Sequence, residues 1–373
     1  MRIFLGINEV ANITNIYAKA FRALGHDSLT AIIQPNPFYP DSKYDFVFKP
    51  SEHNLAYHFR YLRWAWLFTK AIINCDIFIF TYGSMLPNWA DVFYLKQLGK
   101  KLIFVFWGSE IRYMDFFEAQ MKELGVLDEY EPFIRGIRQQ KEELLLSKWK
   151  RVYMAEKFGD LILSQPGYGQ MQTRPYMRAN IPLELERYRH IVPRRERPVI
   201  IHAPSNPLTK GSDYIQEVMD ELYKEGLDFE FQLIQNLPNN ELLPILSNAD
   251  IVIDELYGDT IGMFSHEAMA TGNLVLTHYP ATFAKIPPDC PAVNITRENL
   301  REQVRRAIVD IHWRSELSYR GRLFVEKHCN YIDIAKQMLD WLQPGGISQY
   351  DFVPEEINSP NLRQLINNKI NSK

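Results

Sequence analysis

The sequence predicts an α/β protein with two domains, each built on a parallel sheet. At 373 residues the chain exceeds the size of a usual single hydrophobic core, so two domains are expected. Short apolar runs alternate with amphipathic helical segments from residue 2 onward. The same order of strand, helix and strand begins again after residue 197. This alternation is typical of parallel sheets covered by helices.

The first domain begins with a strand, a helix and a second strand. The apolar run 2–7 predicts the first strand, and residues 27–33 predict the second. Between them, residues 12–26 carry apolar side chains at helical spacing, with Asn12 as the expected N-cap and Gly25 as the expected C-terminal stop. The other elements expected in this domain are strands at 75–82 and 101–108, a basic and aromatic helix at 57–72, and a largely solvated helix over 121–151.

The second domain repeats this plan. A strand at 197–204 leads through a loop into a helix at 212–226. Segment 191–198 carries two prolines and four charged residues and is the expected linker between the domains. We therefore expect the first domain to span residues 1–192 and the second to span residues 193–330. Further strands are expected at 229–235, 249–256 and 273–278.

Ligand-binding residues are expected in the loops that follow the strands, in a cleft between the two domains. The loop PSNPLTKG (204–211) leads from a strand into a helix, so free backbone N–H groups and the helix dipole favour an anion there. Lys210 adds a positive charge, and Gly211 lets a ligand approach the backbone closely. The loop lacks the glycine and lysine spacing of a P-loop. The alternative is an ordinary capped helix with an exposed lysine.

The stretch DTIGMFSHEAMATG (259–272) has the same strand-to-helix geometry. Gly262 permits a tight turn and close approach of a ligand at the helix start, and the amides of about residues 262–264 are expected to face the cleft. Glu267 offers two oxygens to paired hydroxyl groups. The alternative is that Glu267 is a solvated helix residue and Asp259 a loop acid or cap. Together, Lys210 and Glu267 suit a nucleoside diphosphate, whose phosphates need a cation and whose ribose needs a hydroxyl acceptor.

Segments 202–215 and 249–276 carry a resemblance to a known family. The chain has an acid at 259 and another at 267, with seven residues between them, and then Ala-Met-Ala and a glycine before a strand. This arrangement resembles the pattern of family 4 glycosyltransferases, the glycosyltransferase group 1 type. FWGSEIR (106–112) is also similar to members of this family. The chain thus resembles a retaining enzyme of the GT-B fold, in which two Rossmann-like domains face each other across a cleft. The resemblance implies that residues 331–373 form a helix and tail that return to the first domain.

The resemblance also implies a role for each matching residue. Lys210 would bind the diphosphate, Glu267 the donor ribose, and Asp259 the hydroxyl groups of the transferred sugar, which makes these three the expected catalytic residues. No nucleophile, metal or cofactor is implied beyond the nucleotide diphosphate sugar itself, because Lys210 and the helix amides would stabilise the charge on the leaving phosphate. The other residues expected in the site are Ser205, Ile261, Gly262 and Met263 on the donor side and Asn12, Trp107 and Glu110 on the acceptor side.

Three positions depart from the family pattern. Position 259 is Asp where Glu is usual, residues 204–206 lack the basic residue that often precedes the lysine, and Trp107 stands where a histidine is common. These departures keep two alternatives open: a catalytically inactive nucleotide-sugar-binding or scaffold protein, and a GT-B epimerase or hydrolase. A nicotinamide dehydrogenase is not expected, because PGYG (166–169) lacks the third glycine of the dinucleotide fingerprint.

Composition and charge limit the kinds of binding partner and the cellular location that we expect. A net charge of −3 gives no general attraction to nucleic acid, so no nucleic-acid partner is expected. The family resemblance implies a saccharide or lipid-linked acceptor. Segments 57–72 and 147–157 combine basic and aromatic side chains and would make peripheral membrane contact. The alternative for both is a core helix with a basic outer edge. No apolar run approaches the ~20 residues of a transmembrane helix, and the 3 cysteines lack a disulfide or metal-ligand pattern, so a cytoplasmic protein is expected.

Overall fold

The computed structural model describes residues 1–48, 54–139, 143–281 and 284–372, with only the backbone for residues 54–61 and 87. The chain folds into two compact units. The first unit comprises Met1–Tyr113, Glu143–Pro182 and Tyr331–Lys373, and the second comprises Met114–Glu142 and Leu183–Asn330. The chain therefore passes between the units at four places, whereas the expected domain boundaries would require passages only after residues 192 and 330.

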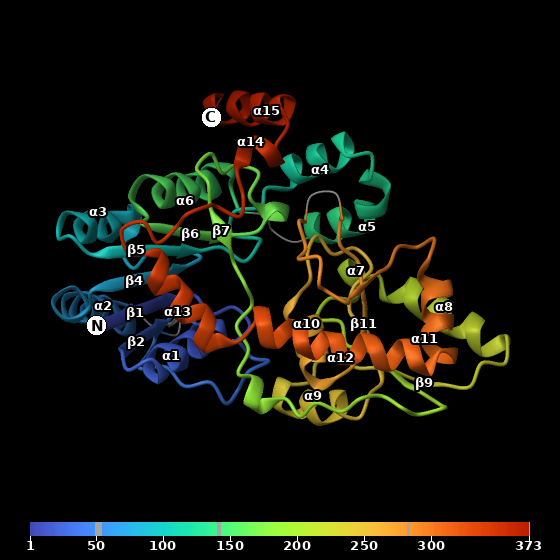
Figure 1. Ribbon diagram of the computed structural model, residues 1–373. Helices are drawn as coiled ribbons and strands as arrows, with labels where there is room; N and C mark the ends of the chain where they lie inside the picture. The colour runs from blue at the N-terminus through green and yellow to red at the C-terminus, as the bar shows by residue number, and fades with distance from the viewer. Residues whose placement is uncertain (49–53, 140–142, 282–283, 373) are drawn as a thin grey trace. The chain divides into compact units, whose positions relative to one another are not determined.

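The first unit is built on a parallel seven-stranded sheet with the strand order β3-β2-β1-β4-β5-β6-β7 (Figure 1). The central strands β1 and β4 are almost entirely buried, which explains why they appear in the sequence as continuous apolar runs rather than alternating ones. The strands are β1 (Arg2–Ile7), β2 (Asp27–Ile32), β3 (Phe46–Val47), β4 (Ile77–Thr81), β5 (Lys101–Val105), β6 (Leu161–Ser164) and β7 (Met177–Arg178).

Helices connect these strands, and the C-terminal segment adds to them. Helix α13 packs against α1, so residues after 331 belong to the first unit (Figure 1). An antiparallel bridge between Tyr176 and Phe352 ties the following tail to the same unit. The helices are α1 (Ile13–Ala23), α2 (Asn54–Asn74), α3 (Ala90–Gln97), α6 (Leu145–Phe158), α13 (Tyr331–Trp341), α14 (Pro354–Ile357) and α15 (Pro360–Asn371).

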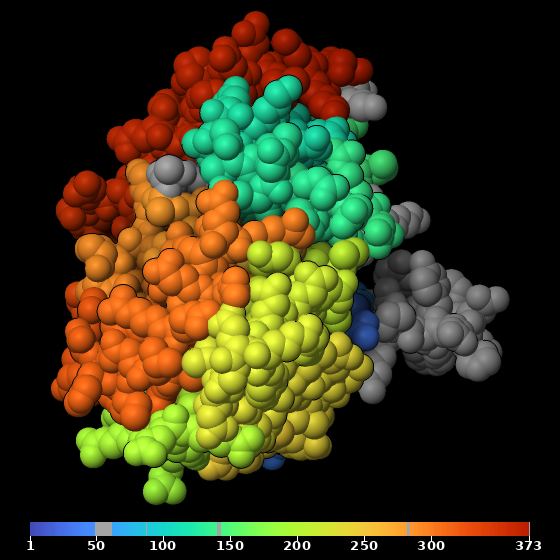
Figure 2. Space-filling model, turned by 90° about the vertical axis from the view of Figure 1, so that its right-hand side faces the viewer, coloured from blue at the N-terminus to red at the C-terminus, as the bar shows by residue number. Residues whose placement is uncertain are grey.

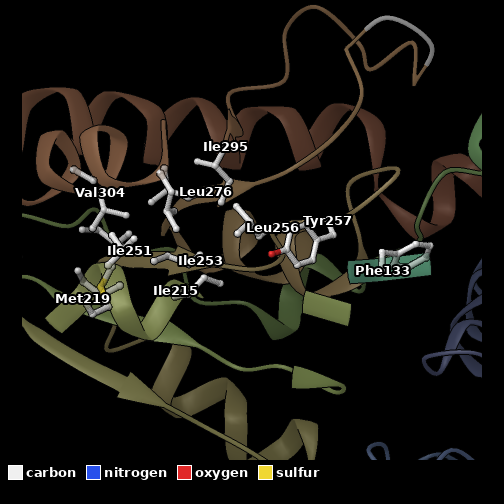
Figure 3. Close-up of a cluster of buried hydrophobic side chains, with 14 of the residues drawn as sticks. Phe133, Ile215, Met219, Ile251, Ile253, Leu256, Tyr257, Leu276, Ile295 and Val304 are labelled. Carbon is white, nitrogen blue, oxygen red and sulfur yellow. The ribbon is translucent and has the colours of Figure 1, made fainter. Parts of the chain in front are cut away.

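The second unit is built on a parallel five-stranded sheet with the strand order β12-β11-β10-β8-β9. Its central strands β8, β10 and β11 contribute a buried apolar cluster that includes Ile251, Ile253 and Leu276 (Figure 3). The strands are β8 (Val199–His202), β9 (Glu230–Leu233), β10 (Ile251–Ile253), β11 (Leu274–Thr277) and β12 (Val293–Asn294). The helices are α4 (Met114–Glu123), α5 (Leu127–Arg138), α7 (Pro207–Lys210), α8 (Ser212–Lys224), α9 (Asn239–Leu246), α10 (Met263–Thr271), α11 (Leu300–Val309) and α12 (Ile311–His328).

Helices α4 and α5 lie between β5 and β6 in the sequence but pack in the second unit. The teal surface that they form in Figure 2 continues onto the yellow and orange surface of that unit. The prediction of one solvated helix over 121–151 is wrong. Gly125, with a φ of 71°, separates α4 from α5, and α6 begins only at Leu145. The apolar side chains of α5, among them Phe133, lie in the same cluster as the sheet of the second unit (Figure 3).

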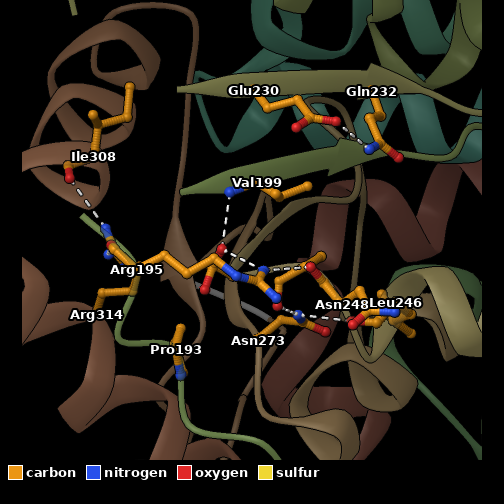
Figure 4. Close-up of polar contacts among 12 residues, drawn as sticks. Pro193, Arg195, Val199, Glu230, Gln232, Leu246, Asn248, Asn273, Ile308 and Arg314 are labelled. Carbon is orange, nitrogen blue, oxygen red and sulfur yellow. Dashed lines mark hydrogen bonds and ion pairs between the residues drawn. The ribbon is translucent and has the colours of Figure 1, made fainter. Parts of the chain in front are cut away.

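Segment 191–198, expected as a linker, is bound to the second unit. The Arg195 guanidinium lies 3.0 Å from the Asp250 carboxylate, which also accepts the Val199 N–H at 2.8 Å (Figure 4). Arg314 donates to the carbonyl oxygen of Arg195, and Ser315 donates to that of Pro193 at 2.7 Å. These bonds satisfy two backbone carbonyl groups of the segment and tie it to the second unit.

The predicted fold class is confirmed, since the chain is an α/β protein with two parallel sheets. Each of the eight predicted strand ranges contains a strand, although most are shorter than predicted. The sequence analysis missed the short strands β3, β6, β7 and β12. It also missed the helices α3, α9, α11 and α12, and α14 and α15 in the tail.

Candidate functional site

Glu267 lies in the second turn of α10, with its side chain buried at 3% relative exposure. Its Oε1 accepts hydrogen bonds from the Tyr188 hydroxyl at 3.1 Å and from the Asn239 amide at 2.9 Å. Asn239 is the first residue of α9, and Tyr188 follows the short 3-10 turn Leu185–Arg187, so three segments meet at this carboxyl group. Glu267 is therefore not a solvated helix residue, and that alternative is wrong.

Burial raises the pKa of Glu267 to about 7, although the hydrogen bonds from Tyr188 and Asn239 favour the charged carboxylate. The group therefore changes its charge near neutral pH. Asn239 Oδ1 is also buried here and has no hydrogen-bond partner among the described residues. A bound hydroxyl group or a water molecule would satisfy this acceptor.

Lys210 ends the short helix α7, and Gly211 follows it with a φ of 74°. The Lys210 side chain is only 16% exposed, and its ammonium group forms an ion pair with Asp254 and lies 3.6 Å from Glu255. Burial disfavours the charged form of Lys210, but the two carboxylates outweigh burial and raise its pKa above the ordinary value. Lys210 is therefore a permanent cation whose charge is already balanced within the unit. The alternative of an exposed lysine is wrong.

Asp254 follows β10 directly and has no exposed side-chain surface. It binds Lys210, and its other oxygen accepts a hydrogen bond from Ser265 Oγ at 2.6 Å. Burial alone would raise the pKa of Asp254, but Lys210 and Ser265 hold it below the ordinary value. Asp254 thus joins the loop that ends in Lys210 to the first turn of α10.

The loop between β10 and α10 carries Asp259, which is 8% exposed. Its neighbour Gly258 has a carbonyl oxygen that accepts two hydrogen bonds, from the Tyr130 hydroxyl at 3.1 Å and from His278 Nδ1 at 2.8 Å. The loop is therefore held by α5 on one side and by the end of β11 on the other. Burial lowers the pKa of His278, although the Gly258 carbonyl and Glu129 favour its charged form.

Gly262 is the N-cap of α10, and Met263 is the first residue of the helix. The amides of residues 263–265 precede the first intrahelical bond, which the His266 N–H donates to the Gly262 carbonyl oxygen at 3.3 Å. Such amides have no partner within the helix and favour an anion. Gly262 itself is extended, with a φ of −83°, and a Cβ there would meet the Asp254 carboxylate at an ordinary 3.6 Å. The backbone therefore does not require glycine at this position, contrary to the tight turn expected, and Ile261 before it is buried in the unit.

The loop before α7 is organised by Asn206. Its side chain caps the helix by accepting the N–H groups of Leu208 at 3.1 Å and Thr209 at 3.4 Å. Ser205, expected on the donor side, is exposed at the start of this loop. The structure thus places Ser205, Lys210, Asp259, Ile261, Gly262, Met263 and Glu267 around the strand-to-helix turns after β8 and β10 of the second unit.

Sequence reasoning missed four residues that build this site. Asp254 and Glu255 balance Lys210, and Tyr188 and Asn239 hold Glu267. The two acids stand at the end of the strand ADIVIDEL, where a charged pair after a buried run is a visible signal. Of the two hydrogen-bond donors, Tyr188 follows a short 3-10 turn and Asn239 is the first residue of α9, and no sequence motif marks either of them.

The acceptor-side residues Asn12, Trp107 and Glu110 lie in the first unit. The indole N–H of Trp107 is buried and has no hydrogen-bond partner among the described residues. Asn12 is the N-cap residue of α1, as predicted, but it has a φ of 65° and its side chain makes no capping bond. Its Oδ1 accepts instead from Asn15 Nδ2 at 3.0 Å and from the Ser42 hydroxyl. Glu110 is buried and accepts the backbone N–H of Trp107, so it is not a surface acid. Burial raises the pKa of Glu110.

Two basic residues of α6 hold the same loop of the first unit. Lys148 donates to the carbonyl oxygen of Arg112 at 2.6 Å, and Arg151 donates to that of Glu110. Arg151 also makes paired 3.0 Å contacts with the Glu143 carboxylate. Both cations are buried. Of the basic side chains in segment 147–157, these two are therefore not available to a membrane surface.

Two other features, a metal site and a membrane-spanning helix, were sought among the described residues. Among them, no group of three or more His, Cys, Asp or Glu side chains is arranged to hold a metal ion. No helix in the described part of the chain has the length and apolar character needed to cross a membrane. In segment 57–72, the side chains of residues 57–61 lie outside the described residues.

Comparison with known proteins gives structural matches only. No family model matches the chain, and no curated protein matches it in sequence. Among solved structures, it is similar to sucrose-phosphate synthase from Thermosynechococcus elongatus, at 14% identity and a TM-score of 0.57 over 91% of this chain and 97% of that one. It is similar to an alpha-glucosyltransferase in complex with UDP and DNA, at 12% identity and a TM-score of 0.56 over 92% and 99% of the two chains.

A third match is WaaG, a glycosyltransferase involved in lipopolysaccharide biosynthesis, at 14% identity and a TM-score of 0.51 over 92% of this chain and 100% of that one. Because one of these structures contains DNA, the likeness does not bear out the expectation of no nucleic-acid partner. Sequence identities this low support a shared fold and nothing more. Nearly the whole chain is matched in each case, and its two parallel sheets are those of the GT-B fold.

Proposed function

We propose that this protein is a glycosyltransferase that moves a sugar from a nucleotide diphosphate sugar to an acceptor. The observation that carries the proposal is Glu267, a buried carboxyl group held by Tyr188 and Asn239 directly behind the free amides of α10. A carboxyl group in this position accepts the ribose hydroxyls while the helix N-terminus binds the diphosphate. The GT-B fold and the family resemblance of segment 249–276 support the same assignment.

In the proposed mechanism, bond cleavage leaves negative charge on the departing diphosphate. Lys210 and the first-turn amides of α10 stabilise this charge, which is an electrostatic contribution to catalysis. Asp259 would bind the hydroxyl groups of the transferred sugar. We assign no protein nucleophile. We propose that a hydroxyl group of the acceptor attacks the sugar on the face from which the diphosphate leaves and gives its proton to the leaving phosphate, with retention of configuration and without a metal ion.

The proposed acceptor is a saccharide or a lipid-linked molecule, and the proposed location is the cytoplasm with peripheral membrane contact. The exposed apolar side chains of α2, namely Leu62, Trp66 and Ile73, support such contact. On α6, Tyr153 is exposed and Lys157 lies over its ring at 5.3 Å. Flotation with anionic and with zwitterionic vesicles tests this contact. Trp66→Ala and Tyr153→Ala are expected to reduce binding, and the absence of any vesicle binding by the wild-type protein would exclude it.

The donor is tested by a binding screen against UDP-, GDP-, ADP- and CMP-sugars, using isothermal titration. Glu267→Ala and Lys210→Ala are expected to weaken binding of the nucleotide that the wild-type protein selects. Glu217→Ala and Lys224→Ala are matched controls, because both side chains are exposed on α8 or at its end. No binding of any nucleotide sugar by the wild-type protein would refute the proposal.

A catalytically inactive nucleotide-sugar-binding protein is the second candidate, and one observation favours it. Lys210 already balances Asp254 and Glu255, so less of its charge is available to a leaving phosphate than the family pattern implies. Turnover separates the two candidates. Release of UDP from UDP-glucose, or of the matching nucleotide from the selected donor, supports the enzyme. Binding without release or transfer, across saccharide and lipid-linked acceptors, supports the inactive binder.

A further inference from the structure

Helix α5 reaches the loop that follows β10 through Tyr130. The Tyr130 hydroxyl donates to the Gly258 carbonyl oxygen at 3.1 Å, and its ring packs edge-on against His278, with 5.2 Å between the ring centres. His278 Nδ1 lies 2.8 Å from the same oxygen. Because a carbonyl oxygen only accepts, Nδ1 carries the proton and donates it there. One backbone carbonyl, directly before Asp259, is thus fixed by two side chains from different elements.

The same helix packs against the other ligand-facing loop of the second unit. A Cβ on Gly136 would lie 2.8 Å from the side chain of Thr209 and 3.4 Å from that of Leu208, so α5 approaches α7 closely. Glycine at 136 makes this approach possible, and a larger side chain would push α7 and Lys210 at its end away from α5. One face of α5 therefore borders both the loop that ends in Lys210 and the loop that carries Asp259.

Apolar packing holds α5 in place beside these two loops. The Tyr130 ring lies 5.5 Å from Phe117 and Phe133 lies 5.7 Å from Phe117, which joins α5 to α4. Phe133 belongs to the same buried cluster as Leu256 and Tyr257 (Figure 3). A side chain in a packed cluster has one favoured rotamer, so the hydroxyl of Tyr130 is held in place and not merely able to reach Gly258.

We propose that Tyr130 and His278 are positioning residues for sugar transfer, which hold the loop 257–259 so that Asp259 faces the sugar of the bound donor. The inference rests on the proposed function, since it assigns a purpose to a loop of the donor site. It also assigns a role to α4 and α5, which the sequence places between two strands of the other unit: they complete the donor site of the second unit. Tyr130 and His278 act through the backbone and touch no reacting atom.

A hydroxyl deletion separates this role from simple packing. Tyr130→Phe keeps the ring in the cluster and removes the bond to Gly258, whose carbonyl retains the bond from His278. It also removes the 3.4 Å contact between the Tyr130 hydroxyl and His278 Nδ1. Tyr223→Phe is the matched control, because its hydroxyl also donates to a backbone carbonyl, that of Phe229 at 3.2 Å, far along the sheet at β9. Both variants lose a hydroxyl bond to a carbonyl oxygen in the same unit.

The first measurement is hydrogen exchange of the ligand-free protein, which does not depend on the donor. Loss of one hydrogen bond of about 1 kcal/mol corresponds to about fivefold faster opening. Tyr130→Phe is expected to speed exchange of the peptide spanning 256–263 by about this factor, whereas Tyr223→Phe leaves that peptide unchanged. Wild-type exchange in this peptide for Tyr130→Phe would overturn the proposal.

The second measurement compares Kd for UDP and for UDP-glucose, or for the matching pair if the screen selects another nucleotide. Tyr130→Phe is expected to leave the affinity for UDP unchanged and to weaken UDP-glucose about fivefold, because only the sugar meets the loop. Equal weakening of both ligands would show a merely structural role and overturn the proposal. If the wild-type protein binds no nucleotide, the proposed function fails, and the exchange measurement still decides whether Tyr130 holds the loop.

Discussion

Glu267→Gln should raise the free energy of unfolding of the protein and lower its affinity for the nucleotide. The substitution keeps the size of the side chain and an oxygen for Tyr188 and Asn239, but it removes a carboxyl group that burial disfavours in its charged form. Most substitutions at a buried, hydrogen-bonded position destabilise a protein. A gain in stability combined with a loss of binding would therefore be a specific sign of a functional carboxyl group.

The magnitude follows from the pKa of Glu267, which burial raises from its ordinary value of 4.5 to about 7. The folded protein binds this proton more tightly than the unfolded chain does, so the contribution of Glu267 to the free energy of unfolding falls as the pH rises from 4.5 to about 7 and stays low above that range. At about 1.4 kcal/mol per pH unit, the fall amounts to about 3 kcal/mol at most. Glu267→Gln should thus match the wild-type protein near pH 4 and exceed its free energy of unfolding by about 1–3 kcal/mol at pH 8.

Binding should show the opposite dependence on pH. If only the ionised carboxylate accepts both ribose hydroxyls, about one molecule in ten is competent at pH 6 when the pKa is about 7. The wild-type affinity for the selected nucleotide should therefore be about tenfold weaker at pH 6 than at pH 8, a difference of about 1.4 kcal/mol. Glu267→Gln should bind weakly at both pH values.

Urea unfolding between pH 4 and 8 and isothermal titration at pH 6, 7 and 8 measure the two effects. Glu217→Gln, on the exposed face of α8, is the control for loss of one carboxylate. A Glu267→Gln protein that is less stable than the wild-type protein at pH 8 would refute the argument from burial. An affinity that does not change with pH would refute the role of the carboxylate in binding.

Two further substitutions test the geometry around Lys210. Gly211→Ala should lower the free energy of unfolding by about 1–3 kcal/mol in urea, because Gly211 has a φ of 74° and an added Cβ would lie 2.9 Å from the Tyr257 ring. Gly226→Ala, at a φ of 85° with nothing within 4 Å of the added Cβ, should cost only the backbone strain and therefore less. Glu255→Gln should tighten binding of the selected nucleotide about fivefold in isothermal titration, because it removes a negative charge 3.6 Å from the Lys210 ammonium group. Unchanged or weaker binding by Glu255→Gln would show that Lys210 does not contact the phosphates.

The sequence was sufficient for eight of the strands and for the position of the donor-side loops. Buried parallel strands give continuous apolar runs, and helix starts after β8 and β10 are marked by polar loops and glycines. These signals are local, so short windows of sequence contain them. The same holds for Glu267, whose position in α10 follows from the spacing of the stretch 259–272.

The partners of these residues were not predictable, because they lie far apart in the chain. Asp254 is 44 positions from Lys210, and Tyr188 is 79 positions from Glu267. Tyr130 is 128 positions from Gly258, in a helix pair that leaves the first unit and packs in the second. Periodicity assigns such a helix to its sequence neighbours, and only the buried cluster that it joins shows where it belongs.

The charge of Lys210 and the position of the loop after β10 are linked through Glu255. Asp254 is fully buried and tied to α10, so it stays with Lys210, whereas Glu255 is 20% exposed and is the partner that a phosphate would have to displace. Gly258 lies so close to Glu255 that an added Cβ would be 2.7 Å from its carboxyl carbon. The carbonyl of Gly258 is in turn held by Tyr130 and His278. The close approach of Gly258 therefore limits where the Glu255 carboxylate can move. Because His278 still holds the Gly258 carbonyl when the Tyr130 hydroxyl is removed, the Lys210 charge that a bound diphosphate would meet stays the same in Tyr130→Phe.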